Sequence, residues 1–211
     1  MKIIYHDRYL WCVEKDAGVP AEDVPGGVPA WLRAETGKEY VGVVHRLDTG
    51  TGGVMLYAAT REATAALSEA VRTGALHKEY LAVVHGCPAD STGSFRDLLY
   101  HDPRSNKTFV VARERKGVKE AALDYRVLAS GDNLSLLCIT LLTGRSHQIR
   151  VQFASRQMPL AGDRKYGARD SLAGIALWAQ KLTLQHPLTG ETLTFSSAPP
   201  VAAPWNGFAA R

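Results

Sequence analysis

The stretch VVHRLDTGTGGVML, residues 43–56, places charged side chains between two apolar runs. His45, Arg46 and Asp48 lie where a buried strand should begin, and a Thr-Gly-Thr-Gly-Gly sequence follows them. An aspartate before such a turn usually accepts hydrogen bonds from nearby backbone N–H groups. A catalytic carboxylate fits the same pattern, so the residues alone leave both roles open for Asp48.

The composition is that of an ordinary folded protein, with 211 residues, 45% of them hydrophobic and 22% charged. No apolar run approaches the roughly 20 residues that span a membrane, and the first residues lack the pattern of a signal peptide. We therefore expect a cytoplasmic protein. The three cysteines lie far apart and form no Cys-x-x-Cys pair, which predicts neither a disulfide framework nor a zinc site.

Positive charge gathers in the second half of the chain. Residues 144–170 hold six basic and two acidic residues, although the whole chain has a net charge of only +4. A gathered basic patch suits a polyanion such as nucleic acid. A solvated surface of no special function has the same composition, and charge alone does not decide between the two.

The order of the expected elements indicates an α+β fold. Strands are expected at 3–5, 9–15, 53–59, 79–86 and 174–184, with a hairpin over 184–197, β-structure through 91–142 and a surface loop over 16–29. Thr60 should cap a helix that Gly74 ends. A second helix is expected over 145–156, with Ser146 as its cap. Strands come in runs rather than alternating with helices, which is typical of α+β proteins.

Three further polar clusters stand out. The segment TGRSHQIR, 143–150, joins a strand to a helix start, a common place for a site and also for a plain cap. Tyr80 opens an apolar strand, where it is either a core residue or a plate on which a base stacks. In PLAGDRKYGA, 159–168, turn residues accompany Arg164, Lys165 and Tyr166, and such charges beside an aromatic ring suit RNA.

The order and spacing of these segments resemble the RluA-type pseudouridine synthases, which act on ribosomal and transfer RNA. The resemblance rests on HRLDTGTGGVML, KEYLAVVHG, LLTGRSHQIRVQFA, PLAGDRKYG and LTLQHPLTGETLTF, and it covers nearly the whole chain. The sequence departs from the family pattern at four positions. Gly52 replaces a Ser, Asp16 a Pro, Ser146 a Thr and Trp178 a His.

The resemblance implies a mixed, largely antiparallel sheet flanked by helices, with two subdomains around a basic RNA-binding cleft. It also implies one catalytic domain over 1–211, without an N-terminal accessory RNA-binding module, acting as a monomer without an obligate protein partner. The reaction is the isomerisation of uridine to pseudouridine within a ribosomal or transfer RNA stem–loop, and no metal or other cofactor is needed.

The resemblance assigns catalytic roles to Asp48, to Tyr80, which would stack on the extruded uracil, and to Arg145, which would pair with Asp48. Arg46 would help displace the uridine, and the glycines after Asp48 would let RNA approach. Attack on the sugar, addition to the uracil and proton abstraction all stay open for Asp48. The expected RNA-binding residues are Arg46, His45, Arg104, Lys107, Gln148, Arg150, Arg164 and Lys165.

Two other functions are compatible with parts of the sequence. A non-catalytic RNA-binding or ribosome-assembly factor could use the same scaffold, but the joint presence of Asp48, Tyr80 and Arg145 speaks against it. A metal-dependent RNA hydrolase using His45 and Asp48 would lack ligands.

Overall fold

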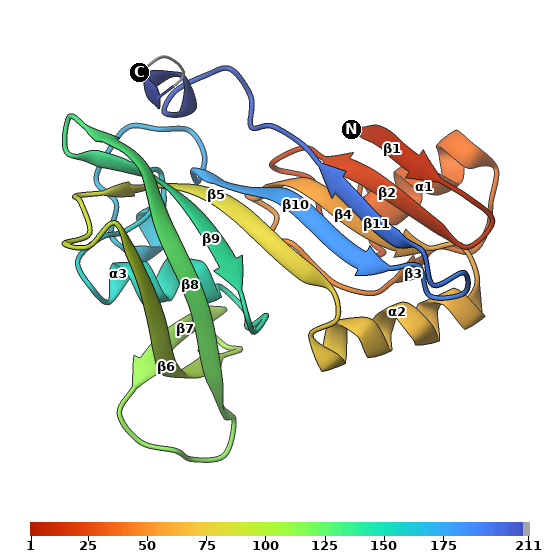
Figure 1. Ribbon diagram of the computed structural model, residues 1–211, viewed down its shortest axis with the longest axis horizontal. Coiled ribbons are helices and arrows are strands. Elements are labelled where there is room, and N and C mark those ends of the chain that lie inside the picture. Colours follow the sequence, from red (N-terminus) through yellow and green to blue (C-terminus); the bar gives the residue numbers. More distant parts are fainter. Residues whose placement is uncertain (209–211) are drawn as a thin grey trace. The chain divides into compact units, whose positions relative to one another are not determined.

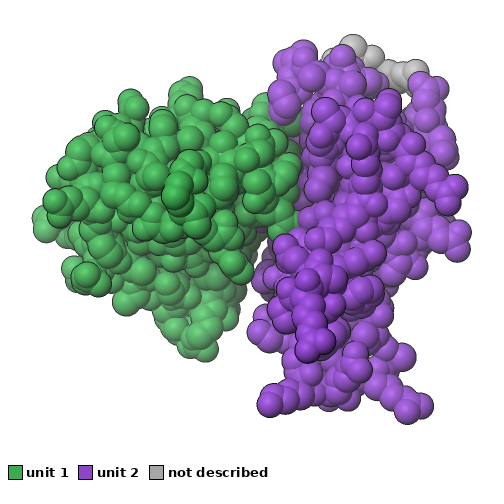
Figure 2. Space-filling view, turned by 180° about the vertical axis from the view of Figure 1, so that it is seen from behind, with its two compact units in different colours: residues 1–78, 178–199 green, residues 79–177, 200–211 purple. Residues whose placement is uncertain are grey.

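The computed structural model describes residues 1–208, which divide into two compact units (Figure 1, Figure 2). Unit 1 comprises Met1–Lys78 and Trp178–Pro199, and unit 2 comprises Glu79–Leu177 and the chain from Pro200 onward. The predicted single domain, and the cleft predicted between its subdomains, stay predictions.

Unit 1 is built on strands β1, β2, β4 and β10, which neighbour one another in that order. Their bounds are Lys2–His6, Leu10–Lys15, Gly52–Ala58 and Leu177–Gln185. The short strand β3 (Gly42–Val43) pairs with β4, and β11 (Thr192–Ser196) pairs with β10. Of these pairs, β4 with β10 is parallel and the others are antiparallel. All seven residues of β4 are buried, so the strand predicted after Asp48 is confirmed.

Two helices belong to unit 1, and one of them was not predicted. Helix α2 (Arg61–Thr73) begins at Thr60, whose side chain accepts the Ala63 N–H at 3.1 Å, and ends at a left-handed Gly74. Helix α1 (Val28–Thr36) begins inside the segment expected to be a loop. Pro29 lies in its first turn, where proline is compatible with a helix because no hydrogen bond is lost there.

Unit 2 contains strands β5, β9, β8, β6 and β7 in that order. Their bounds are His77–His85, Leu134–Leu141, Val118–Gly131, Thr92–Asp102 and Lys107–Val111. The pairs β6 with β7, β6 with β8 and β8 with β9 are antiparallel. The predicted mixed, largely antiparallel α+β fold is therefore confirmed. No helix among residues 1–208 is long and apolar enough to span a membrane.

Helix α3 (Gln148–Ala154) packs against β6 and β7 of unit 2, beside the 3₁₀-helix η1 (Arg164–Tyr166). It begins after His147, which adopts the left-handed conformation and makes no side-chain cap. The prediction that Ser146 caps this helix was wrong, and so was the predicted start at 145. A second 3₁₀-helix, η2 (Trp205–Phe208), packs its aromatic rings on the buried cluster of Val83, Ala161 and Ala176.

Candidate active site

Asp48 lies in a tight turn, residues 48–51, directly before β4; we call these residues the Asp48 turn. The Thr51 N–H donates to the Asp48 carbonyl oxygen at 2.9 Å, and the Gly18 N–H donates to the Thr49 carbonyl oxygen at 2.7 Å. The Asp48 side chain is only partly exposed. The backbone that carries the carboxylate is therefore fixed from two sides.

A buried lysine forms a hydrogen bond to the backbone of this turn. Lys15, at the end of β2, is 0% exposed. Its Nζ donates to the carbonyl oxygens of Asp16, Val19 and Thr49 at 3.1, 2.7 and 3.2 Å. Burial lowers the pKa of Lys15 to about 8, against the opposing effect of the negative charges on Asp16, Asp48 and Glu22. Sequence reasoning did not single out Lys15, because a lysine in an apolar strand gives no sign of what it bonds.

His45 and Arg46 point to different environments. His45 is buried, and its Nε2 accepts the Leu56 N–H at 3.0 Å. Burial, helped by the positive charge of Lys78, lowers the pKa of His45 to about 3. The ring is therefore neutral, and its Nε2 is already occupied, which argues against an RNA contact and against a metal ligand at this atom. Arg46 is exposed and lies 3.3 Å from a Glu22 oxygen.

The glycines after Asp48 have a structural reason. A Cβ on Gly52 would lie 2.3 Å from the Trp178 ring, and one on Gly53 would lie 2.2 Å from the Ala179 carbonyl oxygen. Gly53 also has a φ of 115°, which favours glycine. Close approach of β10 to β4, rather than of RNA, therefore explains these two residues. The departures at positions 52 and 178 belong together, because the Trp178 ring fills the space that a serine side chain at position 52 would take.

Arg145 lies in a second turn, residues 143–147, which we call the Arg145 turn. The buried Gln148 holds it, since its Oε1 accepts from the Arg145 N–H at 3.0 Å and from Thr143 Oγ1 at 2.8 Å. The Gln148 Nε2 donates to the Ala122 carbonyl oxygen at 3.0 Å. The Arg145 side chain is exposed, and its Nε donates to the Glu120 carbonyl oxygen at 2.9 Å.

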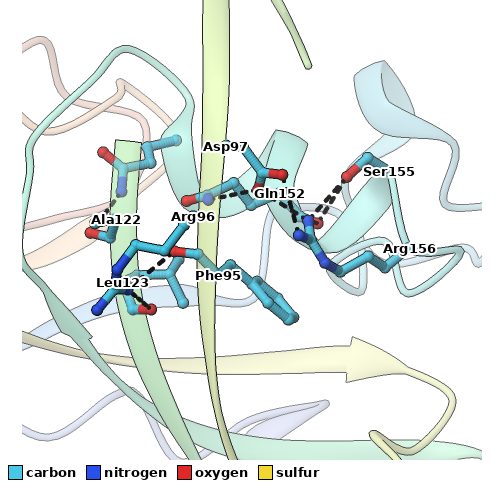
Figure 3. A network of polar contacts seen from close by, with 9 residues as sticks. Phe95, Arg96, Asp97, Ala122, Leu123, Gln152, Ser155 and Arg156 are labelled. Carbon is cyan, nitrogen blue, oxygen red and sulfur yellow. Dashed lines mark hydrogen bonds and ion pairs between the residues drawn. The ribbon is translucent and has the colours of Figure 1, made fainter. Parts of the chain in front are cut away.

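A polar network within unit 2 joins helix α3, which follows this turn, to strand β6 (Figure 3). On β6, Asp97 accepts from Gln152 Nε2 at 2.7 Å and from Arg156 Nη1 and Nη2 at 3.0 and 3.1 Å. The Arg156 guanidinium also lies 3.9 Å from the centre of the Phe95 ring. These contacts hold α3, and with it the Arg145 turn, in one position.

Besides His45, two predicted RNA-binding residues of unit 2 are buried. Gln148 holds the Arg145 turn, as described above, and Arg150 forms a bidentate ion pair with Asp163 at 2.7 and 2.9 Å. Both ends of this ion pair are less than a tenth exposed. Their local partners argue against direct phosphate contacts by Gln148 and Arg150. A buried pair separated by 13 residues in the sequence gives no local signal from which it could be predicted.

The other predicted residues of unit 2 lie on separate segments. Tyr80 is 7% exposed on β5. Arg104 is exposed in the hairpin between β6 and β7, Lys107 begins β7, and Arg164 and Lys165 are exposed in η1. Four basic side chains, those of Arg104, Arg145, Arg164 and Lys165, are therefore exposed on three segments of this unit.

Comparison with known proteins gives one consistent result. A profile of the family described as RNA pseudouridylate synthase matches residues 9–155. The dual-specificity RNA pseudouridine synthase RluA of Haemophilus influenzae is 32% identical over 210 residues, which are 93% of this chain and 92% of that protein. An uncharacterized RNA pseudouridine synthase of Synechocystis is 32% identical over 92% of this chain, which spans 64% of that protein's length.

A solved structure agrees at the level of the fold. The human protein called RNA pseudouridylate synthase domain containing 1 matches with a TM-score of 0.80 and 23% identity, over 95% of this chain and 84% of that one. The profile match and the identity to the Haemophilus protein assign the chain to the RNA pseudouridylate synthase family, the isomerases that act on uridine in RNA.

Proposed function

We propose that this protein converts uridine to pseudouridine in ribosomal or transfer RNA, with Asp48 as the catalytic carboxylate. In this reaction the bond from the uracil N1 to the sugar C1′ breaks and the base turns. A bond from C5 to C1′ then forms, the hydrogen on C5 leaves as a proton, and N1 takes up a proton in its place, so that the product is an isomer of the starting uridine. The observation that carries the proposal is the Asp48 turn, in which a partly exposed carboxylate is held at a fixed backbone position over a buried lysine.

The charge of Lys15 attracts a negative charge on Asp48. A carboxylate that acts as a nucleophile or a base must be deprotonated, whereas bound RNA excludes water and brings phosphates close, and both effects favour the protonated acid. The ammonium of Lys15 opposes this, since it interacts favourably with the negative charge on Asp48. The same function requires that Lys15 stay protonated at the working pH.

Arg145 and Tyr80 complete the proposed catalytic set. Arg145 pairs with Asp48 during the reaction, because a guanidinium keeps its charge at working pH and bonds a carboxylate through two N–H groups. Its exposed side chain and its fixed Nε suit this role. Tyr80 stacks on the uracil that leaves the RNA stack, and Arg46, which is exposed, helps to displace that base.

The proposed phosphate contacts come from the exposed basic side chains. Arg104, Arg164 and Lys165 carry them, and Lys107 contributes from the start of β7. His45, Gln148 and Arg150 are left out, because each is buried with partners inside its own unit. The RNA is a stem–loop of ribosomal or transfer RNA, bound by a monomer in the cytoplasm without an obligate protein partner.

The proposal is tested by mapping pseudouridine in total RNA from three strains. One strain carries the wild-type gene, one lacks it, and one carries the nearly isosteric Asp48→Asn variant. We expect at least one position to be pseudouridine in the first strain and uridine in the other two. Identical maps in all three strains would contradict the proposed activity.

A further inference from the structure

The hydroxyl of Tyr166 lies where three segments of unit 2 meet. It accepts the Thr108 N–H at 2.8 Å and lies 2.8 Å from Nδ1 of His147. Thr108 is the residue after Lys107 on β7, His147 ends the Arg145 turn, and Tyr166 follows Lys165 in η1. Each of the three segments therefore carries an exposed or partly exposed basic group proposed above for catalysis or for RNA binding.

The hydrogens of this cluster can be assigned one by one. Thr108 Oγ1 donates to the Ser146 carbonyl oxygen at 2.8 Å, so it accepts from Nδ1 of His101, 3.1 Å away. A phenol hydroxyl has one hydrogen to donate and also accepts through its lone pairs, so Tyr166 can accept the Thr108 N–H and donate to Nδ1 of His147 at the same time. With that donation, neutral His147 carries its ring hydrogen on Nε2.

The surroundings of Tyr166 favour this positioning role over stacking on a base. The side chain is only partly exposed, and burial raises the pKa of its hydroxyl, which keeps the donated hydrogen in place. The Arg150 guanidinium lies 5.0 Å from the ring centre, and the Lys107 ammonium lies 5.4 Å from it. The ring is thus already engaged by cations of its own unit.

His147 links this cluster to Arg145. Its φ is 52°, in the left-handed region that residues other than glycine adopt only where the surroundings hold them. Two bonds hold it: the Val151 N–H donates to its carbonyl oxygen at 3.0 Å, and Tyr166 bonds its ring. A change in the His147 backbone would alter the direction of the Arg145 turn, which ends at this residue.

We propose that Tyr166 is a positioning residue that acts through His147 to hold Arg145 in its reactive position. The same hydroxyl keeps the hairpin that carries Arg104, the Arg145 turn and η1 together as one RNA-contacting surface of unit 2. This inference rests on the proposed catalytic role of Arg145.

The first test compares Tyr166→Phe with the control Tyr125→Phe, which removes a hydroxyl from β8 of the same unit. The measurements are the single-turnover rate at saturating RNA and the dissociation constant for RNA. Tyr166→Phe should lower the rate at least about tenfold with affinity within about threefold, because the phosphate-binding side chains remain while the reactive geometry is lost. The control should match wild type in both. A wild-type rate in Tyr166→Phe would overturn the proposal.

A double variant tests whether the effect runs through Arg145. In an Arg145→Lys background the fork of the guanidinium is already absent, so adding Tyr166→Phe should change the residual rate by less than about twofold. If Tyr166→Phe lowered the rate by the same factor in both backgrounds, the link to Arg145 would be refuted.

A third measurement needs no RNA and no activity. The ¹⁵N NMR shifts of the His147 ring, recorded at about pH 8 where an ordinary histidine is neutral, should show hydrogen on Nε2 in wild type and in Tyr125→Phe. Tyr166→Phe should lose the hydrogen bond to Nδ1, and the Nδ1 signal should move toward that of an imidazole nitrogen without a hydrogen bond. An Nδ1 shift that is the same in all three proteins would overturn the proposal. A wild type that forms no pseudouridine but shows these shifts would contradict the proposed function alone.

Discussion

The Asp48 turn of unit 1 and the Arg145 turn of unit 2 are both held by a buried polar side chain, but they carry side chains of opposite charge. Each turn carries a side chain proposed above to be catalytic, and in each a buried polar group bonds the turn backbone. Beneath Asp48 this group is the ammonium of Lys15, a donor to three carbonyl oxygens. Beneath Arg145 it is the neutral amide of Gln148, which both donates and accepts.

The difference follows from the charge that each turn presents. A buried cation favours an ionised carboxylate, whereas it would repel a guanidinium. A neutral amide fixes the backbone under Arg145 and adds no charge of its own. The supporting residue is therefore matched to the side chain it carries, and exchanging the two kinds of support should harm each turn differently.

The largest expected effect comes from removing the guanidinium itself. Arg145→Met should lower the single-turnover rate by at least about 100-fold, and Arg145→Lys should recover little, because the two-pronged contact is lost. Arg126→Met, at an exposed arginine on β8 of the same unit, serves as the control and should retain activity. Near-wild-type turnover in Arg145→Met would remove Arg145 from the mechanism.

The contact between Gly52 and the Trp178 ring predicts that substitutions at these two positions compensate each other. Gly52→Ser should lower the free energy of unfolding by about 3 kcal/mol, because the added side chain collides with the Trp178 ring. Trp178→His alone removes packed volume, and the double variant should recover most of the loss from Gly52→Ser. Urea unfolding of all four proteins measures this. Additive losses in the double variant would show that the two positions are independent.

Acid should lower the stability of the protein through His45, whose Nε2 accepts the Leu56 N–H. Its pKa is about 3 in the folded protein and about 6.5 in an unfolded chain. The unfolded chain therefore binds the proton first as the pH falls below about 6.5, and stability is lost between about pH 6.5 and 3. The loss from this residue is about 2 kcal/mol at pH 5.

His45→Gln tests this expectation, since a neutral amide oxygen can accept the Leu56 N–H without titrating. The difference in unfolding free energy between wild type and His45→Gln should shift by this amount from about pH 7 to about pH 5, in favour of the variant. A difference that stays constant over this range would mean that His45 is not held neutral.

The smallest expected effect comes from exchanging the kind of support under Asp48. Lys15→Gln should lower turnover roughly tenfold at pH 7, by removing one positive charge near the carboxylate. Wild-type turnover should fall as the pH rises through about 8, where Lys15 loses its proton, whereas Lys15→Gln should show no such fall. The exposed Lys2→Gln of unit 1 is the control.

Stability should change in the opposite direction in the same pH range. The folded pKa of Lys15 is about 8, below its ordinary value, so between pH 8 and about 10 the unfolded chain binds more protons. The free energy of unfolding of wild type, relative to Lys15→Gln, should therefore rise with pH in that window. If the free energy of unfolding depended on pH in the same way in both proteins, the pKa of Lys15 would not be lowered in the folded protein.

Helix caps, helix ends and buried strands could be predicted wherever a few neighbouring residues determine them. The Thr60 cap, the Gly74 end and the buried strand after Asp48 each follow from a few neighbouring residues. Helix α1 was not predicted, because Gly27 and Pro29 are typical of loops, although both are also compatible with the start of a helix. The start of α3 was predicted wrongly, because the residue before the helix is His147 and not Ser146. His147 is in the left-handed conformation, and its ring bonds Tyr166, which is distant in the sequence.

The residues of the candidate site were proposed from sequence motifs and stay predictions, whereas the buried groups that support them could not be predicted. The basic segment 144–170 indicated a polyanion partner, yet Arg150 and Arg156 are held by Asp163 and Asp97. These aspartates lie 13 and 59 residues away along the chain, so a count of charges includes two arginines already engaged inside unit 2. The supporting role of Lys15 depends likewise on Thr49, 34 residues away.

The most direct test of the central claim follows the hydrogen on C5 of uridine. Because the new bond to the sugar forms at C5, RNA tritiated at this carbon should release tritium into water as pseudouridine forms. We predict release by wild type and by Asp23→Asn, which alters an exposed aspartate of unit 1 paired with Arg33. Asp48→Asn should bind the RNA and release no tritium above background. Substantial release by Asp48→Asn would contradict the assignment of Asp48 as the catalytic carboxylate.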